Sequence, residues 1–96
     1  MVEHIVVFKS KQDSVTELVG KLRDFCQRSL SEIDGIEYAS AGENFSPHGD
    51  GFDAALAVRL RDRSALEAYM SHPLHKAVAA DIRPLLESRV IIDYEG

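Results

Sequence analysis

The residues of this sequence best suited to chemistry are Tyr69, His72 and His75, which lie together in the segment YMSHPLHK. Histidine gains and loses a proton near neutral pH, so it serves as a general acid, a general base or a metal ligand. A tyrosine hydroxyl can donate a hydrogen bond to an oxygen that becomes negatively charged during a reaction. The segment therefore predicts a metal site, an acid–base site or a purely structural helix break.

Pro73 argues against the metal site. Within a continuous helix, two histidines three residues apart share one face and can bind one ion. Proline interrupts a helix interior but fits its first turn, so we expect a helix to restart at Pro73 with His72 as its cap. The two imidazoles then need not point the same way, and no carboxylate lies at a familiar ligand spacing. We predict no metal site.

The acid–base interpretation assigns separate roles to three residues. His75 falls in the first turn of the restarted helix, where the helix dipole disfavours the charged imidazolium and favours a neutral general base. Tyr69 precedes it and can stabilise a developing enolate. His4, between Val2 and Val6 on an apolar strand face, can orient either group.

The same helix start also presents free backbone N–H groups, which are a candidate site for a ligand carboxylate. The predicted ligand contacts at this place are His72, Leu74 and Lys76.

A structural interpretation of these residues stays open. A histidine on an apolar strand face is more often a core residue than a catalyst, and Tyr69 can serve packing alone. His48 lies in a glycine-rich loop and is expected to be solvated. Cys26 falls on the apolar stripe of a predicted helix and is expected to be a small core residue rather than a nucleophile.

The elements that must position these residues follow the order β-α-β-β-α-β. Strands are predicted from β-branched and alternating residues, and helices from apolar residues at helical spacing. The predicted strands are residues 2–9, 36–45, 52–60 and 89–94, and the helical patterns run through residues 15–33, 64–72 and 73–85. This order predicts an α+β, ferredoxin-like domain, with a four-stranded antiparallel sheet and helices on one face. Capping boxes are predicted at Ser14–Glu17 and Ser64–Glu67.

Three predicted strands are apolar on both sides. In the first strand, for example, Ile5 and Val7 alternate with His4 and Val6. A sheet covered by helices on one face normally shows water a polar opposite face. We therefore predict that a second copy of the chain covers the open face, giving a homodimer with a barrel-like interior. A monomer with a sparsely apolar outer face is the alternative.

Composition narrows the class of protein. The length of 96 residues predicts one domain over 1–96. The net charge of −5, with a single short arginine cluster interrupted by Asp62, argues against a nucleic-acid partner. One cysteine excludes an intrachain disulfide, and no apolar run approaches the length of a membrane span. We expect no membrane association and a cytoplasmic location.

The sequence resembles the stress-responsive A/B barrel domain, or Dabb, family over essentially its whole length. The resemblance is carried by His4 in HIVVFK, by IDGI, GENFSPHGDGFD and YMSHPLH, and by IIDYE near the end. It implies a dimeric α+β barrel of ferredoxin-like subunits. Many members of the family are known only as stress-associated or uncharacterised proteins, so the resemblance also implies a stress association.

One branch of that family is similar to cofactor-free plant polyketide cyclases, which close a linear polyketide by an intramolecular aldol step. The resemblance implies that Tyr69 and His75 match the catalytic pair of that branch, and that His4 matches its first-strand histidine. A further cavity histidine of the branch falls near Ala54, where this chain has no counterpart.

Two functions follow as hypotheses. The first is binding of a small molecule in a cavity between sheet and helices. The second is cofactor-free chemistry on a carbonyl compound, with His75 as base, Tyr69 as oxyanion donor and His4 in support. A purely structural assembly module, in which side chains fill the cavity, is a third class.

Overall fold

The computed structural model describes residues 1–96 and confirms the predicted order of elements, with the second helical region divided in two. The strands are β1 (Val2–Ser10), β2 (Ile36–Glu43), β3 (Ala54–Leu60) and β4 (Leu86–Glu95). The helices are α1 (Val15–Glu32), α2 (Arg63–Ser71) and α3 (Pro73–Ile82), and a short 3-10 turn, Arg83–Leu85, leads from α3 into β4.

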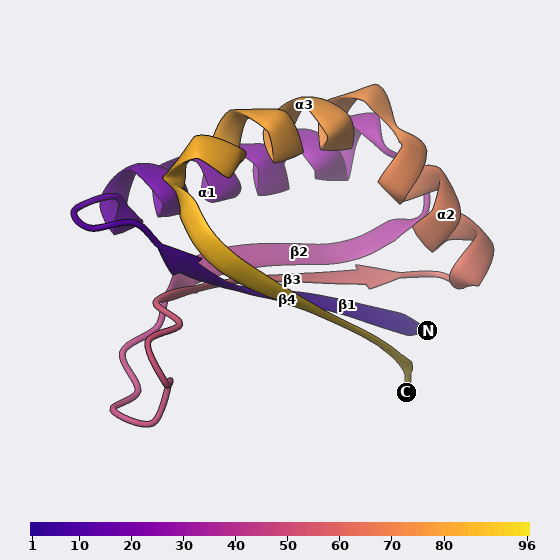
Figure 1. The fold of residues 1–96 in the computed structure, drawn as a ribbon. Coiled ribbons are helices and arrows are strands. Elements are labelled where there is room, and N and C mark those ends of the chain that lie inside the picture. Colours follow the sequence, from indigo (N-terminus) through magenta and orange to yellow (C-terminus); the bar gives the residue numbers. More distant parts are fainter.

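The four strands form one antiparallel sheet in the order β2-β3-β1-β4. The helices cover one face of this sheet and leave the other open (Figure 1). This is the ferredoxin-like arrangement that the sequence predicts. The two central strands, β1 and β3, are the ones whose helix-facing residues are fully buried.

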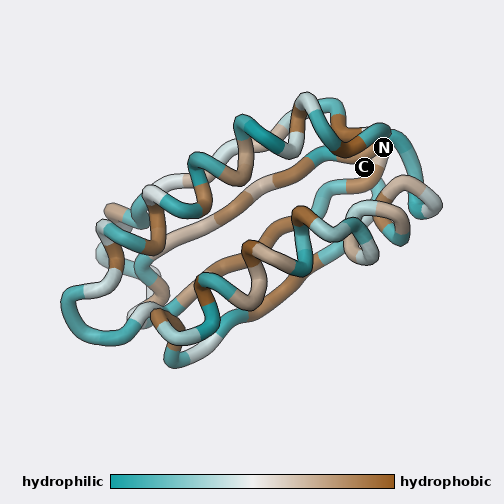
Figure 2. Tube along the Cα trace, turned by 90° about the horizontal axis from the view of Figure 1, so that it is seen from above, coloured by the Kyte–Doolittle hydropathy of each residue, from teal (hydrophilic) through white to brown (hydrophobic).

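The core lies between the sheet and the helices. Seen from above, α1 and α3 lie side by side over the sheet, and hydrophobic residues recur along both (Figure 2). The buried stripe of α1 consists of Leu18, Val19, Leu22, Phe25, Cys26 and Ser29, as predicted from their spacing. The core position of Cys26 is confirmed as well, and burial raises the pKa of its thiol to about 11.

The helix starts differ in part from the prediction. Ser14 is the N-cap of α1, but its hydroxyl makes no capping hydrogen bond, so no capping box forms there. The box predicted at Ser64 is also wrong, because α2 begins at Arg63. Its cap is Asp62, whose carboxylate accepts from the N–H of Ala65. An ionised aspartate is a good cap because it also interacts favourably with the positive end of the helix.

The open face of the sheet is apolar at its centre. Ile5 and Val7 of β1 lie beside Ala57 and Ala55 of β3 on one side, and beside residues of β4 on the other. Val90, Ile92 and Tyr94 of β4 are exposed, as is Tyr38 of β2. Loop 44–53 projects beyond the sheet on the side away from the helices (Figure 1), and it presents Phe45 with 99% of its surface exposed.

None of the helices combines the length and the apolar composition needed to cross a membrane.

Candidate functional site

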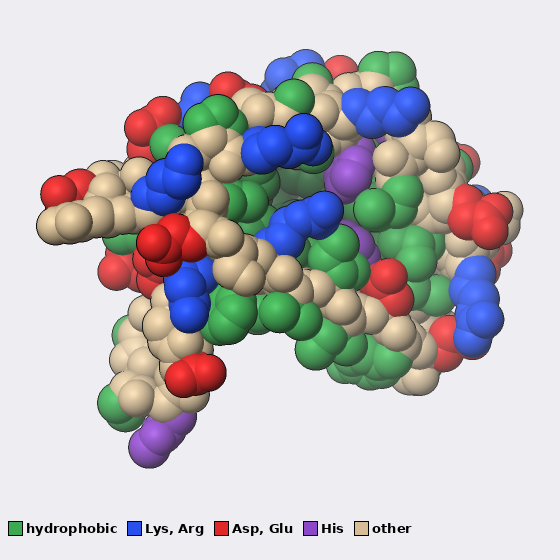
Figure 3. Space-filling view, in the orientation of Figure 1, with side chains coloured by type: hydrophobic (Ala, Val, Ile, Leu, Met, Phe, Trp, Pro, Cys, Tyr) green, Lys and Arg blue, Asp and Glu red, His purple; other side chains and the backbone are tan.

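A cavity of about 90 Å³ lies between the sheet and the helices. Most of its wall is hydrophobic, with residues from β1, α1 and α3 among those that form it. The side chains that carry chemistry in this wall are His4, Tyr69, His75, Arg83 and Arg89. The cavity opens as a hollow in the surface, where histidine atoms are visible among hydrophobic ones (Figure 3).

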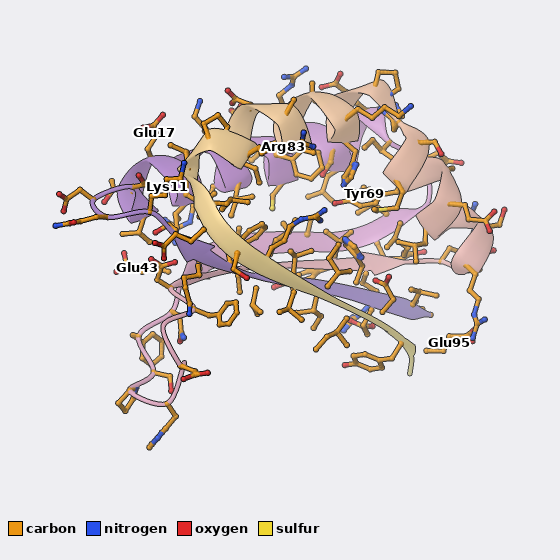
Figure 4. The ribbon with its side chains drawn as sticks, in the orientation of Figure 1. Lys11, Glu17, Glu43, Tyr69, Arg83 and Glu95 are labelled. Atoms are coloured by element: carbon orange, nitrogen blue, oxygen red, sulfur yellow. The ribbon has the colours of Figure 1, made fainter.

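Tyr69 is held by α2 and has no exposed surface. Its ring points into the layer between the helices and the sheet (Figure 4). The Oη atom of Tyr69 is buried and has no hydrogen-bond partner. Burial raises the pKa of this phenol, and Cys26 and Asp93 raise it further, so the hydroxyl keeps its proton and can donate it in a hydrogen bond.

His75 lies in the first turn of α3, next to Tyr69. The two ring centroids are 4.8 Å apart, and Nδ1 of His75 is buried without a hydrogen-bond partner. Burial lowers the pKa of His75, and the charges of His4 and Arg89 lower it further, whereas the backbone carbonyl of Met70 acts in the opposite direction. The imidazole is therefore neutral at neutral pH, as a general base must be.

His4 completes the group from the sheet side. It is 1% exposed, and its ring centroid lies 5.4 Å from that of Tyr69. Its Nδ1 lies 2.5 Å from Oδ1 of Asp93, which is its partner across β1 and β4. A carboxylate at Nδ1 fixes the orientation of the ring and leaves the other nitrogen, Nε2, to face other groups.

The fold thus brings Tyr69, His75 and His4 to one cavity, although the first two are 65 or more residues from the third in the chain. These three residues were grouped as one candidate site from the sequence and the resemblance. No hydrogen bond joins their side chains, and their chemical roles stay proposals.

His72 and its neighbours lie apart from this cavity. Nδ1 of His72 accepts from the N–H of Leu74, so His72 caps α3 as predicted. The N–H of Lys76 donates to the carbonyl of His72. Two of the backbone donors at this helix start are therefore already engaged. A ligand contact at His72, Leu74 and Lys76 stays a prediction and takes no part in the site at the cavity.

Sequence reasoning missed three charged residues of the site: Arg83, Arg89 and Asp93. Alternation along β4 places Arg89, Ile91 and Asp93 on the helix side, opposite Phe8, Val6 and His4 of β1. This register was the signal that could have found Arg89 and Asp93. Arg83 belongs to the 3-10 turn, which the periodic pattern did not separate from α3.

No group of three or more His, Cys, Asp or Glu side chains is arranged to hold a metal ion.

Comparison with known families agrees with this geometry. The family model of the stress responsive A/B barrel domain matches residues 2–96. The chain belongs to the Dabb family. No curated protein sequence gives a significant match to it.

Solved structures of Dabb-like folds align over nearly the whole chain. A Dabb family protein from Mesorhizobium loti is 27% identical, with a TM-score of 0.79, over 99% of this chain and 95% of that one. A dimeric protein of unknown function from Bacteroides fragilis is 26% identical, with a TM-score of 0.86 and the same coverage of 99% and 95%. A hydroxynitrile lyase from Passiflora edulis is 18% identical, with a TM-score of 0.82 over 97% and 90%, a likeness that shows the fold alone.

Proposed function

We propose that this Dabb domain binds a small carbonyl compound in the cavity and catalyses proton transfer at the carbon next to the carbonyl group, without a cofactor. One observation carries the proposal. Oη of Tyr69 and Nδ1 of His75 are the two buried side-chain polar atoms that lack a hydrogen-bond partner, and their residues share one cavity wall. Leaving such atoms unpaired costs roughly 1–3 kcal/mol each, so a ligand that pairs with them binds favourably.

The proposed step uses these two groups together. His75, neutral because it is buried, takes the proton from the carbon beside the carbonyl group. The electron pair of the broken C–H bond forms a carbon–carbon double bond, and the carbonyl oxygen takes up the negative charge as an enolate. Tyr69 donates its O–H to that oxygen. His4, held by Asp93, orients the tyrosine ring from the sheet side. Return of the proton from His75 to the carbon completes an exchange reaction. Alternatively, the enolate carbon attacks a second carbonyl carbon, and the new alkoxide oxygen takes the proton from His75.

The size of the cavity limits what it encloses. An engineered cavity of about 150 Å³ binds benzene, so about 90 Å³ holds a fragment of a few heavy atoms. We therefore expect the reacting carbonyl end to lie inside, with any remaining part of the molecule in the opening.

One further point supports catalysis. A protein with this fold is a hydroxynitrile lyase, so the fold is compatible with catalysis. Ala54, near which the cyclase branch has a further histidine, is not part of the wall of this cavity. The missing histidine separates this chain from the cyclase branch, so the proposal rests on Tyr69, His75 and His4 alone.

The test is hydrogen exchange in deuterated water. A small ketone such as 2-butanone, or the methyl ester of 4-oxopentanoic acid, is incubated with the protein, and loss of the signal of the protons beside the carbonyl is followed by NMR. We expect exchange faster than in buffer. His75→Gln should slow the protein-dependent rate about 100-fold or more, the usual contribution of a general base. Tyr69→Phe should slow it by a similar factor, as for loss of one oxyanion donor.

A matched control separates chemistry from folding. His48→Gln changes the same residue type as His75→Gln at an exposed position outside the cavity and should exchange at the wild-type rate. If the ketones bind in the cavity but their exchange is not accelerated, the domain is a binding protein and the catalytic proposal is wrong. If exchange is accelerated equally in all variants, the chemistry lies elsewhere on the protein.

We also propose that the domain acts as a homodimer, joined through the open face of the sheet. The apolar centre of that face and the exposed residues of β4 support this, and several solved structures with this fold are dimeric. A role in stress response and a cytoplasmic location stay predictions.

A further inference from the structure

The opening of the cavity carries two arginines that no other side chain neutralises. The chain has seven arginines, and four of them form ion pairs: Arg28, Arg59, Arg61 and Arg63. A fifth, Arg23, donates to the carbonyl of Ala41. Arg83 and Arg89 form neither an ion pair nor a side-chain hydrogen bond, and these two line the cavity.

The two arginines are exposed to solvent on a chain with a net charge of −5. Acidic side chains outnumber basic ones by 16 to 11, yet none pairs with the two arginines. Asp93, on the same face of β4 as Arg89, is engaged by His4. Lys or Arg side chains border the hollow in the surface view (Figure 3). The opening is thus locally positive on an acidic protein.

We propose that the natural ligand is an organic anion, in which a charged group held by Arg83 and Arg89 lies a short distance from the carbonyl group that enters the cavity. This inference rests on the small-molecule site proposed above and names the class of its ligand. Guanidinium groups hold planar anions through two parallel hydrogen bonds, so a carboxylate fits them well. A phosphate monoester shares this chemistry and is distinguished by experiment.

The geometry also limits the length of the ligand. Arg83 comes from the 3-10 turn that follows α3, and Arg89 comes from β4, so the two cations approach the opening from different elements. Both belong to the same wall as Tyr69 and His75. Arg83 and Tyr69 are labelled on the helix-covered side of the sheet in Figure 4. Arg89 is close enough for its charge to act on the imidazole of His75. A ligand of a few bonds therefore reaches from the arginines to the reacting groups.

The test compares a charged ligand with its neutral counterpart. Binding of 4-oxopentanoate and of its methyl ester is measured by NMR titration at low salt, because screening weakens exposed charge pairs. Dihydroxyacetone phosphate is measured alongside as the phosphate arm. We expect an anion to bind the wild type about tenfold or more tightly than the ester, equivalent to about 1.4 kcal/mol.

The variants assign this preference to the two arginines. Arg83→Gln and Arg89→Gln should each reduce the preference several-fold, and the double variant should remove it while leaving ester binding unchanged. Arg61→Gln is the control, since Arg61 is exposed and pairs with Asp62. The anion that binds more tightly shows whether the charged group of the ligand is a carboxylate or a phosphate.

Each result decides a separate question. Equal binding of anions and ester, a preference that survives in the double variant, or no binding of any probe overturns the inference. If the protein prefers an anion to the ester through its arginines but does not accelerate hydrogen exchange, the inference is supported and the catalytic proposal is wrong. Exchange of the neutral ketone, together with equal binding of the anions and the ester, supports catalysis and contradicts the anionic ligand.

Discussion

Tyr69 places a hydroxyl where the protein provides no partner for it. The side chain has no exposed surface, and the unpaired Oη costs free energy in the folded state. Groups of this kind persist at functional sites, where a ligand supplies the missing hydrogen bond. The same holds for Nδ1 of His75.

Tyr69→Phe is therefore expected to preserve or increase the stability of the protein while it abolishes the proposed function. The ring and its packing stay, and the unpaired hydroxyl is removed, so we expect the free energy of unfolding to rise by about 1 kcal/mol or to stay unchanged. Hydrogen exchange of a bound ketone should be lost in the same variant. Urea denaturation followed by circular dichroism gives the stability. A loss of more than about 1 kcal/mol would show that the hydroxyl has a structural partner after all.

His75 makes stability depend on pH. Its pKa in the folded protein is below the ordinary value of about 6.5. Just below that pH the unfolded chain takes up a proton and the folded protein does not, so stability falls with decreasing pH. The loss begins near the unfolded pKa and is complete below the folded one. His75→Gln should flatten this dependence between about pH 7 and 5, as measured by urea denaturation at several pH values.

His48→Gln is the matched control, because His48 is exposed in loop 44–53. The prediction fails if His75→Gln and the wild type lose stability equally over this range.

The site could be predicted from sequence only in part, for a physical reason. Proline fixed the position of the helix start, and this placed His75 and Tyr69 near each other. The sequence gives no comparable indication for Arg83 and Arg89. A charged residue near the end of a predicted strand or in a short turn is normally expected to be exposed to solvent. Only the register of β4 against β1 shows that Arg89 faces the cavity.

At the scale of elements, the break at His72 and Pro73 is what separates α2 from α3. The imidazole of His72 satisfies the N–H of Leu74, and Pro73 has no N–H to satisfy. Strand spacing and helix periodicity predicted all the elements within a few residues. The caps were less predictable, because Asp62, one of several polar residues before α2, competes with Ser64 for the same backbone donors.

Gly35 lies between α1 and β2, at a point where the backbone closely approaches α2. It follows α1 and precedes β2, with a φ of 89°, and a Cβ atom placed there would lie 2.8 Å from Cβ of Ala65 in α2. Gly35→Ala should therefore reduce the free energy of unfolding by at least about 1–2 kcal/mol from the left-handed backbone alone. Thermal or urea unfolding measures the change.

Gly20→Ala is the matched control within α1. A Cβ atom at Gly20 meets nothing within 4 Å, and alanine favours the helix. This variant should gain roughly 0.5–1 kcal/mol. Equal effects of the two substitutions would contradict the close packing at Gly35.

At the scale of the whole molecule, the open sheet face predicts association. Ile92 lies at the centre of the exposed stripe of β4 and beside Ile5 of β1. Ile92→Asp should prevent two such faces from packing, because a buried unpaired carboxylate is costly. Sedimentation should give a mass near twice 10.7 kDa for the wild type and near 10.7 kDa for the variant.

Leu30→Asp is the matched control, since Leu30 is exposed on α1, on the other side of the sheet from the proposed interface. It should remain a dimer. The dimer proposal is wrong if the wild-type protein sediments as a monomer at micromolar concentration.

β1 and β4 each present one surface to the cavity and the other to the open face. His4 and Asp93 point to the helices, while their neighbours Ile5 and Ile92 point away. Successive residues of a strand share one backbone, so a shift on one side moves the side chains on the other. In the proposed dimer, we therefore expect ligand occupancy and self-association to be thermodynamically linked. A compound that binds the dimer more tightly than the monomer lowers the dimer dissociation constant by the corresponding factor, and a concentration series of the protein with and without ligand measures that coupling.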